Sequence, residues 1–263
     1  SGPIGRMAVR AGIPLILQEQ NSYAGVTNKL LAKKARKICV AYEGMERFFG
    51  DRNLVFTGNP VRKDLLECGE KREEGIEFYG LDSRRKTVLV TGGSLGAGTL
   101  NKAMVRELEK IAHWEDVQVL WQCGSYYYEG LKNRLAGKLP SNVHLTAFLK
   151  RMDLAYACAD VVIARAGAGT ISELCLLGKT AILIPSPNVA EDHQTKNAMA
   201  LVRKEAAWMI KDAEAEEKFG QVLADLLKDE EKCSLLQKNI ATLAIRDSDE
   251  KIAREILEVI GAE

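Results

Sequence analysis

The chain has 263 residues, of which 46% are hydrophobic and 28% are charged, and its formal net charge is +1. This composition is typical of a globular protein with one large domain or two modest ones, and it excludes an intrinsically disordered chain. The near-zero net charge gives no case for nucleic-acid binding, and no apolar run approaches the roughly 18–20 residues that span a bilayer.

Charge is distributed unevenly along the chain. Residues 1–62 contain ten Lys and Arg against four Asp and Glu, a net of +6, so the remainder carries 27 against 32, a net of −5. Much of the basic excess lies in residues 28–38, beside the apolar Leu30, Leu31 and Ile38. Such a segment suits an anionic membrane surface, but it is also typical of a solvated helix face.

The six cysteines are scattered, with no C-x-x-C pair and no histidine at a metal-ligand spacing. This pattern predicts reduced, buried thiols and predicts neither disulfides nor a metal site. With only three histidines, no Ser/His/Asp or Cys/His constellation is apparent either. The cysteines are Cys39, Cys68, Cys123, Cys158, Cys175 and Cys233.

Short apolar runs alternate with helical patterns along the whole chain. We predict strands at 14–18, 38–41, 54–57, 87–90, 117–121, 143–146, 161–164, 181–184 and 208–210. We predict helices at 26–35, 100–111, 126–135, 152–157, 171–177, 194–204, 215–227, 231–243 and 249–260. This alternation favours doubly wound α/β domains, with parallel sheets covered on both faces.

A charged, glycine-containing break at 62–85 separates three predicted strands from six. Gly58-Asn59-Pro60-Val61-Arg62 lies at this boundary and is either a stiff interdomain link or a plain surface turn. We therefore expect one domain at 1–62 and another at 63–247, with the final segment 248–263 free to cross back. The chain opens on a turn and a helix with no strand before them, so we expect further sequence upstream in the complete protein.

Two small-residue turns follow predicted strands. Arg165-Ala-Gly-Ala-Gly-Thr-Ile-Ser-Glu173 leads from a strand into a helix, and Thr91-Gly-Gly-Ser-Leu-Gly-Ala-Gly98 does the same earlier in the chain. Each turn is typical either of tight packing or of a ligand that approaches helix N–H groups. Both turns follow strand carboxyl ends, so together they indicate a nucleotide crevice. Glu173 is placed to accept hydrogen bonds from ribose hydroxyls, and Ser94 offers a donor to a diphosphate.

Polar side chains also follow two other strands. Asp192-His193-Gln194 opens a helix after a proline-rich loop, and Glu19-Gln20-Asn21 follows the first strand. Asp192 is either a simple N-cap or part of a sugar site. Amide groups both donate and accept hydrogen bonds, so Gln194 and its neighbours suit sugar hydroxyls.

In this order, these motifs closely resemble the MurG family. That family transfers N-acetylglucosamine from its UDP carrier to undecaprenyl-diphosphate-linked N-acetylmuramoyl-pentapeptide, converting lipid I to lipid II in peptidoglycan synthesis. Ser1-Gly2-Pro3 matches the end of the family's second Gly-rich loop, and residues 92–97 with Asn101 match its third. The other matching segments are Glu19–Asn21 with Asn28, Gly58–Arg62, Arg165–Glu173 and Asp192–Gln194.

The resemblance implies an α/β fold of GT-B type, with two Rossmann-like doubly wound domains of which the first is incomplete. It also implies which residues bind substrate. Glu173 would bind the ribose, Ser94 the diphosphate and Leu149 the uracil through its backbone, while Arg62 would bind the donor near the hinge. Asn21 and Gln194 would bind the sugar, and the turn Ala168, Gly169 and Thr170 would also contact the donor. The implied supporting residues are Asn28, Gly92, Gly93, Gly96, Asn101, Arg165 and His193.

The resemblance further implies partners and a location. The UDP-N-acetylglucosamine donor is a substrate, and no cofactor or metal is expected. The implied partners are a polyprenyl-diphosphate-linked acceptor and an anionic membrane surface, without nucleic acid. The implied location is peripheral, on the cytoplasmic face of the bacterial plasma membrane.

The chain departs from the family pattern at several points. Gln18 stands where many relatives have His, and Gly98 stands where many have Arg. The family's first Gly-rich loop, with the histidine favoured as acceptor-side base, is not in this sequence. Glu19 is then the single, weak candidate base, and we expect this chain alone to bind donor without transferring the sugar.

Two other functions stay open at this point. A UDP-N-acetylglucosamine epimerase shares the implied architecture but needs acids and bases around the sugar. A non-catalytic UDP-sugar-binding subunit would need a partner that supplies the acceptor half. A dinucleotide-dependent oxidoreductase fits less well, because the G-x-G-x-x-G fingerprint is missing.

Overall fold

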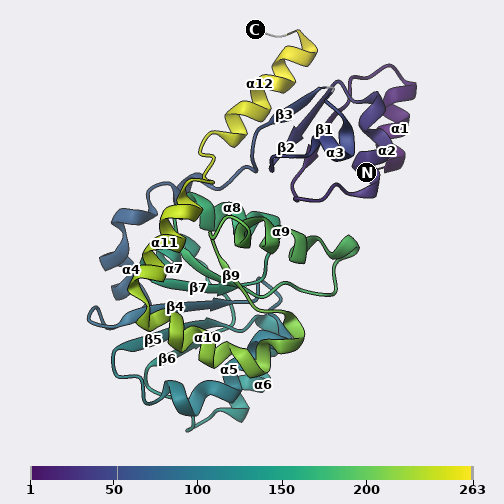
Figure 1. Cartoon of the computed structure of the whole chain (residues 1–263). Coiled ribbons are helices and arrows are strands. Elements are labelled where there is room, and N and C mark those ends of the chain that lie inside the picture. The colour runs from purple at the N-terminus through teal and green to yellow at the C-terminus, as the bar shows by residue number, and fades with distance from the viewer. Residues whose placement is uncertain (1, 52, 262–263) are drawn as a thin grey trace.

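The computed structural model describes residues 2–51 and 53–261. Ser1, from the matched Ser1–Pro3 segment, and residues 262–263, from the predicted final segment, lie outside this range. Two parallel sheets organise the described chain (Figure 1).

The first sheet has three strands in the order β1-β2-β3, all parallel. They are β1 (Ile16–Glu19), β2 (Lys37–Val40) and β3 (Leu54–Phe56). Three helices belong to this part of the chain, namely α1 (Gly2–Arg10), α2 (Val26–Leu31) and α3 (Glu46–Phe49). Helix α1 packs closely on α2, because a Cβ at Gly5 would lie 2.6 Å from a Leu31 methyl carbon.

The second sheet has six parallel strands in the order β6-β5-β4-β7-β8-β9. They are β4 (Lys86–Thr91), β5 (Val117–Gln122), β6 (Val143–Thr146), β7 (Val161–Ala164), β8 (Thr180–Leu183) and β9 (Trp208–Met209). In sequence order this is the 3-2-1-4-5-6 arrangement of a Rossmann-type fold. Successive strands are added on one side of β4 up to β6 and on the other side from β7 onward, so the strand order reverses between β4 and β7. Ligands of such sheets bind beyond the strand carboxyl ends at this reversal.

Helices cover both faces of the second sheet. They are α4 (Arg72–Tyr79), α5 (Gly98–Ile111), α6 (Ser125–Arg134), α7 (Met152–Cys158), α8 (Ala168–Leu177), α9 (His193–Val202), α10 (Ala215–Lys228) and α11 (Glu230–Ala241). Along β4, Val88 and Val90 enter one buried cluster while Leu89 enters another. Burial on both faces explains why these strands read as continuous apolar runs.

The last helix, α12 (Ser248–Ile260), leaves the six-stranded sheet and its helices and lies beside β2 of the first sheet (Figure 1). Lys37 at the start of β2 forms ion pairs with Glu255 at 2.8 Å and Glu258 at 3.1 Å. The start of α12 packs against the hinge segment Gly58–Arg62, because a Cβ on Gly58 would lie 2.6 Å from the Ser248 hydroxyl. Gly58 also has a φ of +77°, so a glycine is needed there on both counts.

All nine predicted strands are present, with ends within two residues of the prediction. Two helical predictions need correction. The helix expected at 26–35 ends at Leu31, where a short 3₁₀ turn (Ala32–Lys34) continues it. The expected break at 62–85 contains α4, whose Gly75 packs so closely on α7 that a Cβ there would lie 2.7 Å from the Leu154 carbonyl oxygen. The glycine that read as a loop signal is therefore a packing residue.

Candidate functional site

The loops that follow β4 and β7 meet at the reversal point and form one wall of a cavity of about 700 Å³, a size in the range of small-molecule sites. Further walls come from the loops after β5, β6 and β8 and from the hinge. Ten of the predicted residues line the cavity: Arg62, Gly92, Gly93, Ser94, Gly96, Leu149, Arg165, Thr170, Glu173 and Gln194. The lining does not include Asn21, Asn28, Asn101, Ala168, Gly169 or His193.

The turn after β4 owes its shape to its glycines. Gly93 and Gly96 have φ values of +80° and +81°, and the Gly96 N–H donates to the Gly93 carbonyl at 2.9 Å. A Cβ at Gly96 would lie 2.0 Å from the Cys123 carbonyl oxygen, so no other residue fits without movement. The turn delivers Ser94 and the N-terminus of α5 to the cavity, where N–H groups and the helix dipole favour an anion.

Arg165 and Asn101 support the two loops through buried hydrogen bonds. The Arg165 guanidinium donates to the carbonyls of Ile184 and Pro185 at 3.0 and 3.2 Å, which ties the β7 loop to the β8 loop. Asn101 donates to the Cys123 carbonyl at 2.9 Å and accepts from the Trp121 indole at 3.0 Å. These contacts show which loops the two side chains join, and the supporting roles expected for them stay predictions.

Glu173 lies on the cavity wall in α8, one helix turn past the glycine-rich segment. The Tyr156 hydroxyl donates to its carboxylate at 2.8 Å. Burial raises the pKa of Glu173 above its ordinary 4.5, against the lowering effects of the Tyr156 hydrogen bond and the Arg62 charge. A partly desolvated carboxylate of this kind gains most when a ligand supplies hydroxyl donors.

Glu19 organises the loop between β1 and α2. Its carboxylate accepts hydrogen bonds from the side chain of Asn28 at 2.8 Å, the Gly25 N–H at 2.9 Å and the Asn21 N–H at 3.1 Å, and it is 3% exposed. These donors occupy both carboxylate oxygens, and Glu19 is not among the residues that line the cavity. This position favours a structural role for Glu19 over the role of general base.

The helix α9 opens on an unusual backbone. Glu191 and Asp192 both have positive φ values, of 54° and 53°, and the Asp192 side chain makes no capping hydrogen bond. The simple N-cap interpretation of Asp192 is therefore wrong. Gln194 reaches back so that its Oε1 accepts from the Ser186 N–H at 2.8 Å, while the His193 ring lies 3.3 Å from the Glu191 carboxylate.

The sequence analysis missed several residues of the cavity wall, notably Gln122, Tyr127, Phe148 and Tyr156. Tyr127 lies beside the N-terminus of α5, because a Cβ at Gly98 would lie 3.1 Å from its hydroxyl oxygen. Phe148 is 52% exposed next to Leu149, which is unusual for a large apolar side chain that serves packing alone. The adjacency of Phe148 to the predicted Leu149 was a usable signal, whereas Tyr127 reaches the cavity from a helix that the motifs do not include.

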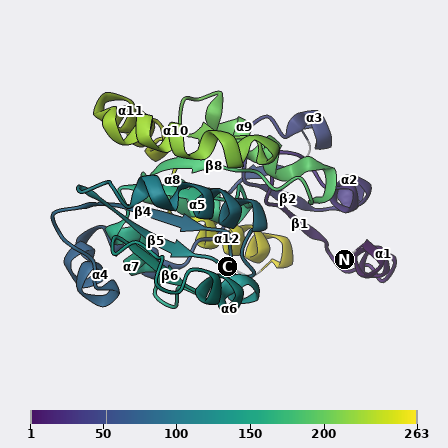
Figure 2. The ribbon, with the colours of Figure 1, turned by 90° about the horizontal axis from the view of Figure 1, so that it is seen from below.

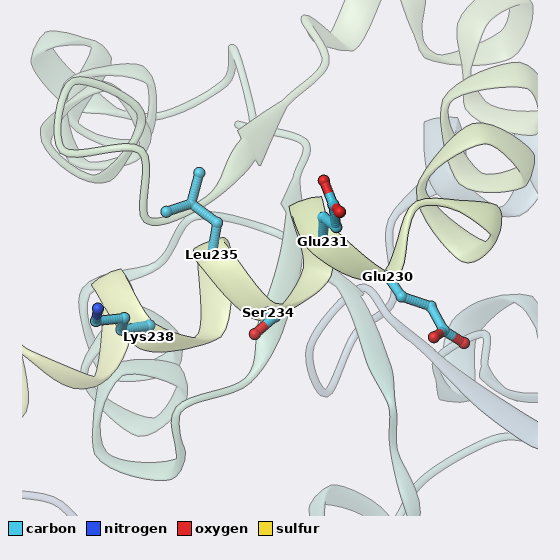
Figure 3. Close-up of a pocket in the computed structure, with 5 residues that line it drawn as sticks. All are labelled: Glu230, Glu231, Ser234, Leu235 and Lys238. Atoms are coloured by element: carbon cyan, nitrogen blue, oxygen red, sulfur yellow. The ribbon is translucent and has the colours of Figure 1, made fainter.

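A second depression lies on the outer face of α11, lined by Glu230, Glu231, Ser234, Leu235 and Lys238 (Figure 3). Its side chains come from a single surface helix, and in the close-up they point in several directions rather than toward a common centre. None of the predicted site residues lies there.

Comparison with known proteins decides the family. Residues 87–256 match the glycosyltransferase family 28 C-terminal domain. A protein of Parabacteroides distasonis, named UDP-N-acetylglucosamine--N-acetylmuramyl-(pentapeptide) pyrophosphoryl-undecaprenol N-acetylglucosamine transferase, is 55% identical over 260 residues, covering 99% of this chain and 70% of that protein. The chain belongs to the MurG family of glycosyltransferases.

Solved structures agree with this family. The crystal structure of Acinetobacter baumannii MurG superposes with a TM-score of 0.77 at 28% identity, covering 98% of this chain and 71% of that one. The UDP-GlcNAc 2-epimerase of Neisseria meningitidis, bound to UDP-GlcNAc, gives a TM-score of 0.71 at 14% identity, covering 97% and 70%. The likeness to the epimerase shows a shared GT-B fold alone, whereas the sequence relationship is to the transferases of the MurG family.

Proposed function

We propose that this chain binds UDP-N-acetylglucosamine as the donor part of an enzyme that transfers N-acetylglucosamine, with inversion, to a polyprenyl-diphosphate-linked N-acetylmuramoyl-pentapeptide. The observation that carries the proposal is the single cavity in which two glycine-rich turns, Glu173 and Gln194 converge at the reversal point of the six-stranded sheet. Membership in the MurG family supplies the substrate class.

Each part of the donor has a matching group. Glu173 would accept hydrogen bonds from the ribose hydroxyls, and the backbone around Leu149 would contact the uracil. Ser94, Tyr127 and the N–H groups at the start of α5 would hold the diphosphate. Gln194, whose Oε1 is used by Ser186, would present its side-chain N–H group to the sugar.

The reaction follows from this arrangement. An acceptor hydroxyl attacks the anomeric carbon from the face opposite the diphosphate, the bond from that carbon to the diphosphate oxygen breaks, and UDP leaves. Negative charge grows on the diphosphate during this step, where the α5 N-terminus and the loop N–H groups stabilise it. The proton of the attacking hydroxyl passes to a base, and Glu19, which does not line the cavity, is not placed for that role.

We also propose domain boundaries and a membrane-facing surface. Residues 1–62, with α12, would form the acceptor side, and residues 63–247 the donor side. Helices α1 and α2 lie at the outer edge of the first domain (Figures 1 and 2). Ile4 (76%) and Met7 (59%) on α1, Leu30 (62%) on α2, and Lys33 and Lys34 of the following 3₁₀ turn are exposed. A region that exposes both apolar and basic side chains suits peripheral binding to anionic lipid, which we propose for the cytoplasmic face of the membrane. No helix in the described part of the chain is long and apolar enough to cross a membrane.

Calorimetric titration with UDP-N-acetylglucosamine, UDP and a purine diphosphate tests the donor site, with transfer of labelled sugar to a lipid-linked acceptor as the second readout. We expect the two uridine ligands to bind and the purine nucleotide not to bind. An Asp225→Ala variant is a suitable control, because Asp225 lies on α10, outside the cavity lining, and its carboxylate accepts a hydrogen bond from Gln221 of the same helix. Equal affinity for purine and uridine diphosphates would overturn the proposed substrate.

A further inference from the structure

A buried asparagine on α9 joins the two domains. Asn197 is fully buried, and its Oδ1 accepts the N–H of Ser22 at 2.9 Å, 175 residues away in sequence. Its Nδ2 donates to the Oδ1 of Asn21 at 3.0 Å and to the carbonyl of Ala166 at 3.4 Å. Ser22 and Asn21 belong to the first domain, whereas Ala166 lies in the donor turn after β7.

The backbone partners fix the orientation of this amide. A peptide N–H can only donate and a peptide carbonyl can only accept, so Asn197 must turn its Oδ1 to Ser22 and its Nδ2 to Ala166. Asn21 must then present its Oδ1 to Asn197, which leaves the Nδ2 of Asn21 toward the Glu19 carboxylate at 3.4 Å. Within the described part of the chain the Asn21 Nδ2 makes no other hydrogen bond, so its second N–H can donate to a ligand.

A second asparagine, Asn59 in the hinge, binds the turn at Gln20–Ser22. The Asn59 side chain donates to the Gln20 carbonyl at 3.0 Å and to the Ser172 hydroxyl on α8 at 3.1 Å. Ser172 in turn donates to the carbonyl of Ala168, the first residue of α8. The Gln20–Ser22 turn is thus tied to the donor domain on both sides, along the edge where α8 and α9 face the first domain (Figure 1).

We propose that Asn197 is a positioning residue. It fixes Asn21 of the first domain relative to the donor turn at Ala166, so that the sugar contacts from the two domains are positioned together. The proposal rests on the proposed function, because it takes Asn21, which is not among the residues that line the cavity, as the sugar contact that the family resemblance implies. It assigns Asn197 no contact with substrate. Instead, its side-chain amide fixes the position of the Asn21–Ser22 segment relative to the donor turn.

The chemistry makes asparagine specific at this position. Aspartate would place a second acceptor oxygen opposite Asn21 Oδ1 and the Ala166 carbonyl, and it would bury a charge. Alanine would leave the Ser22 N–H and the Ala166 carbonyl without this partner. Neither change is at a residue that we propose to contact the uridine or the diphosphate.

Hydrogen exchange tests the contact itself, independently of any activity. In the wild-type chain the Ser22 amide should exchange slowly, and in Asn197→Ala its protection should fall by about tenfold or more, while strands β4 and β5 stay protected. The matched control is Asn142→Ala: Asn142 is also buried and donates three hydrogen bonds, to the carbonyls of Ile111, Trp114 and Val117, all within the donor domain. Unchanged protection at Ser22 in Asn197→Ala would overturn the proposal.

Ligand affinity tests the consequence. Asn197→Ala should weaken UDP-N-acetylglucosamine binding by about tenfold while leaving UDP binding within about twofold, and adding Asn21→Ala should cost little more, because the two amides act as a unit. Asn142→Ala should alter neither affinity. Equal losses for both ligands would assign Asn197 to general support of the donor domain and contradict the proposal. If the wild-type chain bound neither ligand, the proposed function would fail while the exchange result still decided the contact.

If Asn197→Ala does not fold, two measurements remain. In the wild-type chain, rapid exchange of the Ser22 amide and the Asn197 side-chain amide would by itself contradict the contact. The Asn21→Ala variant changes a half-buried loop residue, and it should lose sugar-dependent affinity while keeping UDP affinity.

Discussion

The Tyr156 hydroxyl donates a hydrogen bond to the Glu173 carboxylate over 2.8 Å, which joins α7 to α8 at the wall of the donor cavity. Burial raises the pKa of both groups, that of Tyr156 well above its ordinary value. A neutral phenol thus faces a carboxylate that water solvates poorly. Such a carboxylate is prepared to receive the hydroxyl donors of a ribose.

Replacing Glu173 with alanine should weaken UDP binding. The variant loses a pair of hydrogen bonds to a charged group, about 2–3 kcal/mol, or roughly 30–150-fold in affinity. Calorimetry with UDP measures the effect, and Asp225→Ala should leave the affinity unchanged. A Glu173→Ala variant with wild-type UDP affinity would remove Glu173 from the ribose site.

The raised pKa of Glu173 also predicts a pH effect on stability. The folded-state pKa lies above the ordinary value of 4.5, so the folded chain binds the proton more tightly than the unfolded chain does. The resulting stabilisation is present below pH 4.5 and is lost as the pH rises through the raised pKa. Glu173→Gln lacks this titration, so its free energy of unfolding should gain on that of the wild type as the pH rises across this window. Urea unfolding of both proteins between pH 4 and pH 8 measures the difference, and a constant difference would contradict the prediction.

Tyr127 should contribute to diphosphate binding through its hydroxyl. Tyr127→Phe removes a donor beside the α5 N-terminus, and a hydrogen bond to a charged phosphate contributes about 1.5–3 kcal/mol, roughly tenfold or more in affinity. The adjacent Tyr126 offers a matched control, because it is 83% exposed and its Tyr126→Phe change removes the same atom outside the cavity lining. The loss should appear with UDP and not with uridine; equal losses with both would argue against a phosphate contact.

Binding to anionic vesicles should depend on Lys33 and Lys34. Both are exposed, and each basic residue near an anionic surface contributes about 1 kcal/mol at moderate ionic strength. The neighbouring Lys37, which the sequence placed in the same basic face, is held by Glu255 and Glu258 and should be left out of the variant. Vesicle sedimentation should show that Lys33→Glu with Lys34→Glu binds less well, while Lys228→Glu with Lys238→Glu on the donor domain binds normally. Equal binding of the first variant and the wild type would assign these lysines to a solvated helix face.

Lys37 should instead control the attachment of α12. The hydrogen bonds that Lys37 donates to Glu255 and Glu258 raise the pKa of Lys37, so the attraction is present below its ordinary pKa of 10.5 and is lost at higher pH. Lys37→Glu replaces this attraction with repulsion, and we expect earlier proteolytic cleavage in α12, more so at low salt. Lys63→Glu is the comparison, since the contact of Lys63 with Asp249 at the start of the same helix is longer, at 3.7 Å. Unchanged cleavage in Lys37→Glu would show that apolar packing alone holds α12.

The sequence by itself determined the order of elements and the two small-residue turns. Strands such as β7 are apolar on both faces, and the glycines at Gly93 and Gly96 are required by a local backbone shape, so both signals lie in a few neighbouring residues. The charged segment that contains α4 was misread for the same reason. The function of Gly75 depends on a close contact with α7, which no local pattern reveals.

Tertiary structure decided which of the predicted residues act together. Glu19 and Asn21 stand two residues apart in a polar motif, yet the fold buries the first under donors from Gly25 and Asn28 and joins the second to Asn197, 176 residues along the chain. Lys37 and Lys34 look alike in a basic run, yet α12 returns from the far end of the chain to pair with Lys37. Burial and long-range hydrogen bonds are set by elements distant in sequence, and they determine whether a polar side chain supports the fold or remains available to a ligand.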